Sequence, residues 1–179
     1  MSNPQEATPP SAIERGADLE TSEQRLSLIV FSGELDRLLA AFVLATGAAA
    51  SGMIVNMFFT FWGTTALRRP RHRRSKDLLS CVLGWMLPRG TTELPLSRLN
   101  FAGVGPRLIR RRMKAHGVAS LDDLIALSGE LGVRIRICEM SMNLLGLERE
   151  ELIEYPHLDF CGVSTFIGIA SGSKTTMFL

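Results

Sequence analysis

The chain has 179 residues, of which 46% are hydrophobic and 21% are charged, and its formal net charge is +2. This length and apolar content fit one compact domain with a substantial core, and the charge balance defines neither an acidic nor a basic protein. The first residues lack the pattern of a secretory signal, so we expect a cytoplasmic protein. The number of cysteines, three, is odd, which argues against a disulfide framework and favours reduced thiols.

Residues 1–24 differ in composition from the rest of the chain. They are rich in Pro, Ser, Glu and Ala and show no apolar periodicity. Such a segment buries too little apolar surface to offset the entropy of ordering it. We therefore expect a flexible tail over residues 1–24 and a single α/β domain over residues 25–179.

The domain begins with a pattern typical of a βαβ unit. Residues 26–31 form a short apolar run that predicts a buried strand. Glu34 and Asp36 then place acid in the first turn of a helix that continues to about residue 50, before a second strand over residues 54–61. A right-handed crossover makes these two strands parallel.

Residues 38–63 also allow a second interpretation. They contain no charged residue, and five arginines follow between residues 68 and 74, as beside a membrane on its cytoplasmic side. However, Ala50-Ser51-Gly52 divides the run and Asn56 interrupts it. A buried helix followed by a buried strand explains the same residues, so we favour a soluble protein and keep membrane association as the alternative.

The remaining expected elements alternate between helices and strands. They are a helix over residues 77–87, a long connection over 91–105, a basic helix over 107–116, a helix over 121–131 opened by a capping box at Ser120 and Asp123, a strand over 133–138, short helices over 141–145 and 148–153, a strand over 158–161, a helix over 164–170 and a strand over 175–179. This alternation predicts an α/β fold in which helices cover both faces of a five-stranded, mainly parallel sheet.

Cys138 is the strongest candidate for chemistry. It ends an expected strand and precedes an expected helix, and ligands bind at this carboxyl edge of open α/β sheets. A thiol that faces a helix N-terminus has its thiolate favoured by the helix dipole. The alternative is that Cys138 is a small buried hydrophobic residue, as most free cysteines are.

The other two cysteines carry weaker signals. Cys81 lies on the apolar side of the expected helix over residues 77–87, which favours a core residue, although a second thiol could accept or resolve sulfur held on another. Cys161 ends a short strand and is interpreted as a core residue. No C-x-x-C pair is present, so the sequence has no motif for thioredoxin-like chemistry.

Metal, nucleotide and nucleic-acid sites have little support. The histidines at 72, 116 and 157 share no ligand spacing, and neither G-x-G-x-x-G nor G-x-x-x-x-G-K-[ST] occurs. The basic stretches 68–76 and 107–114 could attract an anionic partner, such as a lipid surface or an oxyanionic sulfur species. They contain no interleaved aromatic residues, so we do not expect a nucleic-acid partner.

Several segments together resemble one known family. They are Phe31-Ser-Gly-Glu-Leu-Asp36, residues 41–50 with Gly47-Ala-Ala-Ala, Met57-Phe-Phe-Thr-Phe-Trp-Gly63, Met86-Leu-Pro-Arg-Gly90, Pro95-Leu-Ser97 and Cys138-Glu-Met-Ser-Met142. Their order over residues 26–179 is similar to that of the DsrE/DsrF/DrsH-like sulfur-relay family, in the branch often labelled peroxiredoxin-like. The chain departs from the family pattern at Asn143, where Asp is expected, and at Cys161, where Gly is expected.

The resemblance implies a flavodoxin-like, or Rossmann-like, three-layer sandwich, homo-oligomers and sulfur trafficking in the cytoplasm. It implies that Cys138 carries persulfide or thiosulfonate sulfur between donor and acceptor proteins or small sulfur compounds, as a sulfurtransferase-type carrier, without a cofactor or metal. It matches Cys81 to a second cysteine of some members. The alternative hypothesis is a non-enzymatic, oligomeric interaction module, possible at a membrane surface.

Overall fold

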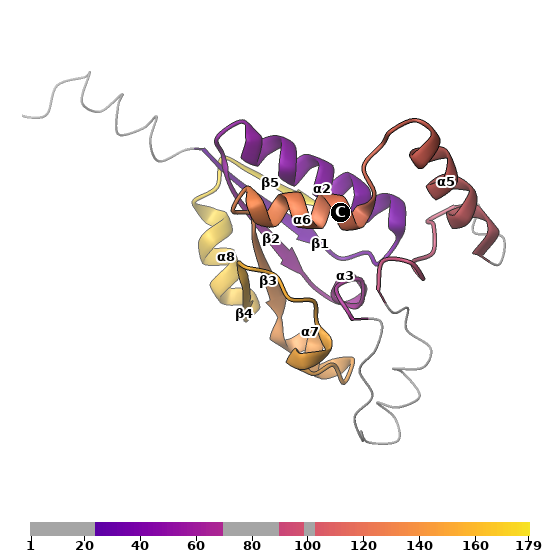
Figure 1. Ribbon diagram of the computed structural model, residues 1–179. Helices are drawn as coiled ribbons and strands as arrows, with labels where there is room; N and C mark the ends of the chain where they lie inside the picture. The colour runs from indigo at the N-terminus through magenta and orange to yellow at the C-terminus, as the bar shows by residue number, and fades with distance from the viewer. Residues whose placement is uncertain (1–23, 70–89, 99–102) are drawn as a thin grey trace, which may run out of the picture.

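The sheet of the computed structural model has five strands, all parallel, in the order β4-β3-β2-β1-β5 (Figure 1). The structure describes residues 24–69, 90–98 and 103–179. The strands are β1 (Arg25–Val30), β2 (Ile54–Phe59), β3 (Arg134–Cys138), β4 (Leu158–Cys161) and β5 (Thr175–Phe178). The prediction of a five-stranded parallel α/β sheet is confirmed.

The helices connect these strands, mostly where the sequence predicts them. They are α2 (Leu35–Ala50), α3 (Trp62–Thr65), α5 (Val104–Ala115), α6 (Leu121–Glu130), α7 (Glu139–Leu144) and α8 (Val163–Ser171). The short helix α3 was not predicted, because four residues are too few for a periodic pattern. The helix expected over residues 148–153 is only a 3-10 turn, Arg149–Glu151.

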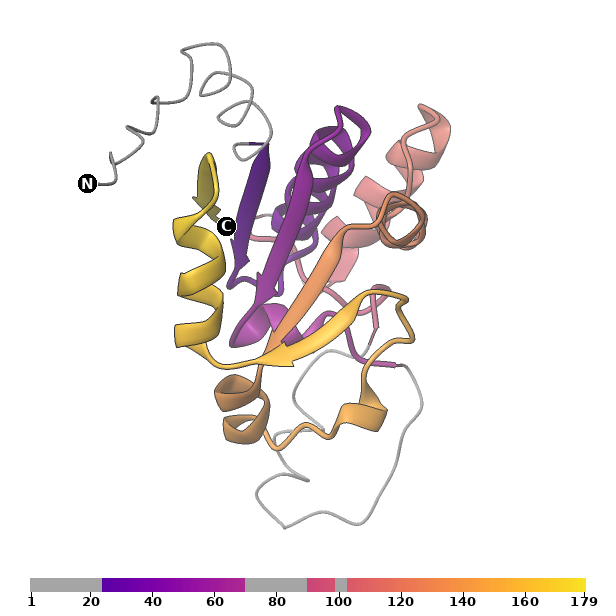
Figure 2. The same cartoon turned by 90° about the vertical axis from the view of Figure 1, so that its left-hand side faces the viewer.

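The two faces of the sheet are covered unequally. Among the described helices, Figure 2 shows α8 (yellow) on one face and α2 and α6 on the other. The α2 and α6 side carries alternate apolar residues such as Leu28, Met57 and Ile135, which are fully buried in the main core. The side facing α8 carries Asn56 and Arg136 in the central strands, so a smaller and more polar interface forms there.

The uncharged run over residues 38–63 is buried in part. Leu38, Phe42 and Ala45 of α2 are buried, and β2 is buried along almost its whole length. The outer side of α2 is exposed and includes Val43 and Leu44, which are 54% and 40% accessible. Burial therefore accounts for the missing charges in β2 and on the inner side of α2. Within the described ranges no helix combines the length and the apolarity that crossing a bilayer requires.

The capping box before α6 is present as predicted. The Asp123 N–H donates to Ser120 Oγ at 3.2 Å, and the Ser120 N–H donates to the Asp123 carboxylate at 2.9 Å. These bonds satisfy two otherwise unpaired groups and fix the start of α6, which leads directly into β3.

Some sequence predictions concern residues outside the described ranges. The tail over residues 1–24, except for its last residue, the helix over 77–87 with Cys81, and the arginines at 71, 73 and 74 lie there. Arg68, the first of the arginine cluster, is described and is buried against Glu151 with an N–O distance of 3.0 Å. It is therefore a core residue and not part of a solvated loop.

Candidate functional site

Cys138 occupies the carboxyl edge of the sheet that the sequence predicts for it. It is the last residue of β3 and the N-cap of α7, so the strand passes into the helix at this residue. The helix starts directly at Glu139, two residues earlier than predicted. The Cys138 side chain is completely buried.

Cys161 lies beside Cys138 in the sheet. The parallel register between β3 and β4 pairs Cys138 with Cys161, and each is the last residue of its strand. Side chains of paired residues in a parallel sheet point to the same face. The fold therefore brings together two free thiols that are separated in the sequence by α7 and the 3-10 turn Arg149–Glu151.

A small apolar cluster encloses the two thiols. Phe58 of β2 and Phe166 of α8 are buried with Cys138 and Cys161, separately from the main core. The two phenyl rings stack with their centroids 4.4 Å apart and their planes 10° apart. Helix α8 thus covers the thiol pair, and Phe166 is its one buried side chain.

The electrostatic surroundings of Cys161 are set mainly by burial. Burial raises the pKa of the Cys161 thiol, and the nearby Arg136 guanidinium opposes this shift. Arg136 lies on the same sheet face as Cys138 and donates a hydrogen bond to Asn56. The Cys138 thiol and the Glu139 and Asp159 carboxylates also raise the pKa of Cys161, so Arg136 is the cation that opposes burial and these neighbours.

Hydrogen bonds and ion pairs hold the strand-to-helix turn at Cys138. Thr60, just after β2, and Ser141 of α7 share a buried hydrogen bond of 2.8 Å between their hydroxyls. Arg149 forms an ion pair with Glu139 at 2.8 Å on the outer side of α7. These contacts attach α7 to the neighbouring strand and loop, and so fix the backbone around Cys138.

Two glycines allow the loops after β1 and β2 to pack closely at the same edge. A Cβ atom on Gly63 would lie 2.3 Å from the Val30 carbonyl oxygen, and one on Gly33 would lie 2.7 Å from the Trp62 carbonyl oxygen. Both distances are shorter than any side chain tolerates. The loops border a cavity of about 390 Å³ that is lined by Phe31, Ser32, Gly33, Glu34, Arg37, Trp62, Thr65 and Pro95.

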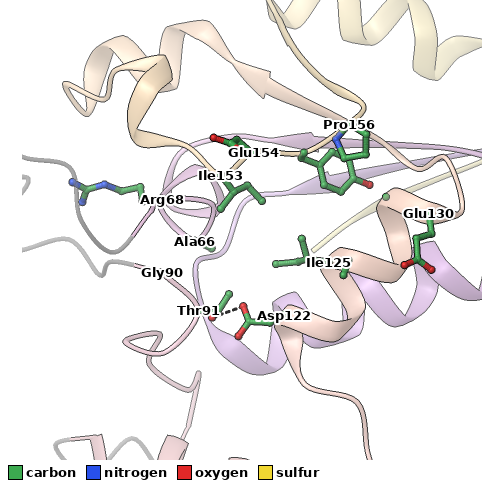
Figure 3. A pocket seen from close by; sticks show the side chains of 13 residues that line it. Ala66, Arg68, Gly90, Thr91, Asp122, Ile125, Glu130, Ile153, Glu154 and Pro156 are labelled. Carbon is green, nitrogen blue, oxygen red and sulfur yellow. Dashed lines mark hydrogen bonds between the residues drawn. The ribbon is translucent and has the colours of Figure 1, made fainter.

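A second cavity, of about 470 Å³, lies between α6 and the segment before β4 (Figure 3). Ile125 of α6 and Ile153 contribute apolar walls, and Thr91 donates a hydrogen bond to Asp122 at its rim. Neither Cys138 nor Cys161 lines this cavity or the one at the glycine loops. The thiols instead lie in the apolar cluster around Phe166.

The structure places only part of the site that the sequence predicts. Cys138 is at the expected sheet edge, whereas Cys81 lies outside the described residues. Sequence reasoning assigned Cys161 to the core and missed its position beside Cys138. Cys138 and Cys161 each end an expected strand. Once β3 and β4 are known to be neighbours, this shared position at the strand ends predicts that the two cysteines lie side by side. Within residues 24–69, 90–98 and 103–179, no three His, Cys, Asp or Glu side chains are arranged to hold a metal ion.

Comparison with known proteins identifies the family. The model of the DsrE/DsrF/DrsH-like family matches residues 22–178. The uncharacterized protein YrkE of Bacillus subtilis (strain 168) is 39% identical over 157 residues, which cover 87% of this chain and 97% of YrkE. The sulfur carrier protein DsrE2 of Allochromatium vinosum is 28% identical over 161 residues, which cover 88% of this chain and 99% of DsrE2. The chain therefore belongs to the DsrE/DsrF/DrsH-like family.

Proposed function

We propose that the protein is a sulfur carrier that holds sulfane sulfur or a thiosulfonate on Cys138. The observation that carries this proposal is the position of Cys138 at the carboxyl edge of a parallel sheet in a chain of the DsrE/DsrF/DrsH-like family. The similarity to a protein named as a sulfur carrier supports the same chemistry. The fold alone would not, because α/β sheets of this type serve many functions.

The proposed transfer consists of two thiolate exchanges. The Cys138 thiolate attacks the outer sulfur of a donor persulfide, a new S–S bond forms at Cys138, and the donor leaves as its thiolate. An acceptor thiolate then attacks the outer sulfur of the Cys138 persulfide and releases the Cys138 thiolate. Each step forms one S–S bond and breaks one, so no cofactor or external oxidant takes part.

A donor must gain access to a buried thiol. Phe166 closes the cluster, and α8 buries no other side chain and has no side-chain N-cap. An element with so few buried apolar contacts opens locally at low cost. We therefore assign the opening to α8, and its exposed Val163 and Ile167 offer a partner protein an apolar contact on the same helix.

The test is intact-mass spectrometry after incubation with thiosulfate, tetrathionate or polysulfide. The wild-type chain and the variant Cys81→Ser should gain a sulfur adduct that reductant removes. The variant Cys138→Ser should gain none, and circular dichroism should show that it is folded. An adduct on folded Cys138→Ser equal to that on the wild type would reject the proposal.

We also propose a homo-oligomer in the cytoplasm, exchanging sulfur with donor and acceptor proteins or small sulfur compounds. The edge strand β5 supports the oligomer. Its Met177 and Phe178 are exposed, and Phe178 is 67% accessible. Edge strands with exposed apolar side chains readily pair with another chain.

A second candidate function is an interaction module at an anionic membrane surface. Helix α5 buries only Gly105 and Pro106, and Figure 1 shows it at the side of the body. Leu108 on this helix is 64% exposed, and Arg111 and Arg112 lie nearby in the same helix. A basic helix with exposed apolar residues is typical of binding to anionic lipid.

Sedimentation with vesicles separates this second candidate from the first. The protein should sediment with vesicles that contain phosphatidylserine and not with pure phosphatidylcholine vesicles. The variant Leu108→Glu should lose this binding, while Leu127→Glu, an exposed leucine on α6, should retain it. Equal binding of both variants would reject α5 as the contact, and sulfur loading on Cys138 would be unaffected by either result.

A further inference from the structure

We propose that Cys161 is a resolving thiol that displaces hydrosulfide from a Cys138 persulfide and forms a Cys138–Cys161 disulfide. This inference rests on the proposed carrier role of Cys138. It adds an intramolecular route by which sulfur leaves the protein when no acceptor is bound, and it assigns a role to a residue that departs from the family pattern.

The geometry of the sheet is the first argument. Cys138 and Cys161 are register partners on adjacent parallel strands with side chains on one face. Neighbouring strands lie ~4.8 Å apart, which is within the ~4.4–6.8 Å between Cα atoms that a disulfide spans. The two thiols can therefore react without a rearrangement of the sheet.

The shared enclosure of the two thiols is the second argument. Cys138 and Cys161 are buried together beneath Phe166 and beside Phe58. A persulfide on Cys138 would be shielded from bulk thiols in the closed state, with Cys161 as the neighbouring nucleophile. Reactants held in contact react far faster than the same groups in solution.

The reaction balances without a further reagent. The Cys161 thiolate attacks the Cys138 sulfur atom, the bond between that atom and the outer sulfur breaks, and the outer sulfur leaves as hydrosulfide with the bond's electron pair. The Cys161 proton passes to solvent. The sulfane sulfur is reduced, the two cysteines are oxidised to a disulfide, and an external dithiol restores the thiols by exchange.

The raised pKa of Cys161 limits the rate at which it resolves the Cys138 persulfide. Burial raises the pKa of the thiol above its ordinary value, so the thiolate is scarce near neutral pH. Resolution is then slow enough for an acceptor protein to compete for the sulfur. It should accelerate by about tenfold per pH unit until the pH reaches the pKa of Cys161.

The experiment uses the full chain with Cys81→Ser, which leaves Cys138 and Cys161 as its thiols. The anaerobic protein is mixed with limiting polysulfide, and intact mass and free hydrosulfide are followed over time. The sulfur adduct should decay to a form that has lost two hydrogens, with one equivalent of hydrosulfide released. Adding Cys161→Ser should extend the adduct lifetime by about tenfold or more and abolish the disulfide.

The outcomes separate this inference from the carrier role. An adduct with the same lifetime in both proteins, with no disulfide, would overturn the resolving role and leave the carrier role in place. The absence of an adduct on Cys138 in the Cys161→Ser protein would overturn both. As a check on the fold, diamide should link Cys138 to Cys161 in the Cys81→Ser protein, and failure to do so would also overturn the resolving role.

Discussion

Cys138 and Cys161 are register partners at the carboxyl ends of two adjacent parallel strands, and both thiols are buried in one apolar cluster. In the proposed mechanism, this relationship gives the cluster a chemical role in addition to its packing role. It also means that substitutions at the thiols change stability, so stability and sulfur chemistry must be measured separately.

Replacing Cys138 tests its position as the N-cap of α7. A serine hydroxyl at this position can accept a hydrogen bond from a backbone N–H of the first turn of α7, whereas alanine cannot. We expect Cys138→Ser to be more stable than Cys138→Ala by about 1 kcal/mol in the free energy of unfolding, measured with urea. Equal or lower stability of Cys138→Ser would show that burial of the hydroxyl in the apolar cluster outweighs the capping bond.

Phe166 should control access to both thiols. Removing its ring opens the cluster, and Phe166→Ala should react with a disulfide reagent such as dithionitrobenzoate at least about tenfold faster than the wild type. The loss of stability should be about 3 kcal/mol. The control is Ile167→Ala, at a 55% exposed position on the same helix, which should change neither the rate of the thiol reaction nor the free energy of unfolding. Unchanged thiol reactivity in Phe166→Ala would place the access route elsewhere.

The raised pKa of Cys161 predicts a loss of stability at high pH. The folded protein keeps the thiol proton to a higher pH than the unfolded chain does, so the unfolded chain binds fewer protons between the two pKa values. The contribution of this thiol is fully present below its ordinary pKa of 9.0 and is lost as the pH rises through the folded value.

Urea unfolding of the wild type and Cys161→Ala across this pH range provides the measurement. The free energy of unfolding should fall more steeply with pH in the wild type than in the variant. Tyr155, whose pKa burial also raises, is common to both proteins and cancels in the comparison. Parallel pH profiles would show that the Cys161 pKa is the same in both states.

Removing one partner of the buried ion pair between Arg68 and Glu151 should lower the free energy of unfolding strongly. Arg68→Met leaves the Glu151 carboxylate without this cation in the interior and should cost about 3–5 kcal/mol. The double variant Arg68→Met/Glu151→Leu should recover most of the loss, because it removes both charges of the pair. Arg37→Met, which breaks an exposed pair with Glu34, should cost less than about 1 kcal/mol in the same urea titration.

The exposed edge at β5 should govern self-association. Phe178→Lys places a charge on the edge strand and should lower the molar mass measured by light scattering after gel filtration. Ile54→Lys, at an exposed position on the central strand β2, should leave the molar mass unchanged. A monomeric wild type would contradict the proposed homo-oligomer.

Local sequence determined most of the secondary structure. The capping box at Ser120 and Asp123, the acid at the start of α2 and the apolar runs of the strands predict these elements, because their determinants lie within a few residues. The position of Cys138 between a strand and a helix could be predicted for the same reason. The segment over residues 148–153 was misjudged, since a short apolar pattern does not distinguish a helix from a single 3-10 turn.

The tertiary structure alone decided which residues meet. The pairing of β3 with β4 places Cys138 beside Cys161, and the packing of α8 buries both thiols under Phe166. The pairing of Arg68 with Glu151 likewise makes a core residue of the first arginine in a charged cluster. These contacts depend on the order of the strands and the placement of the helices. Both are determined by packing between residues far apart in the sequence, so the spacing of neighbouring residues does not predict them. The sequence thus located Cys138 at the edge of the sheet, and the order of the strands placed Cys161 beside it.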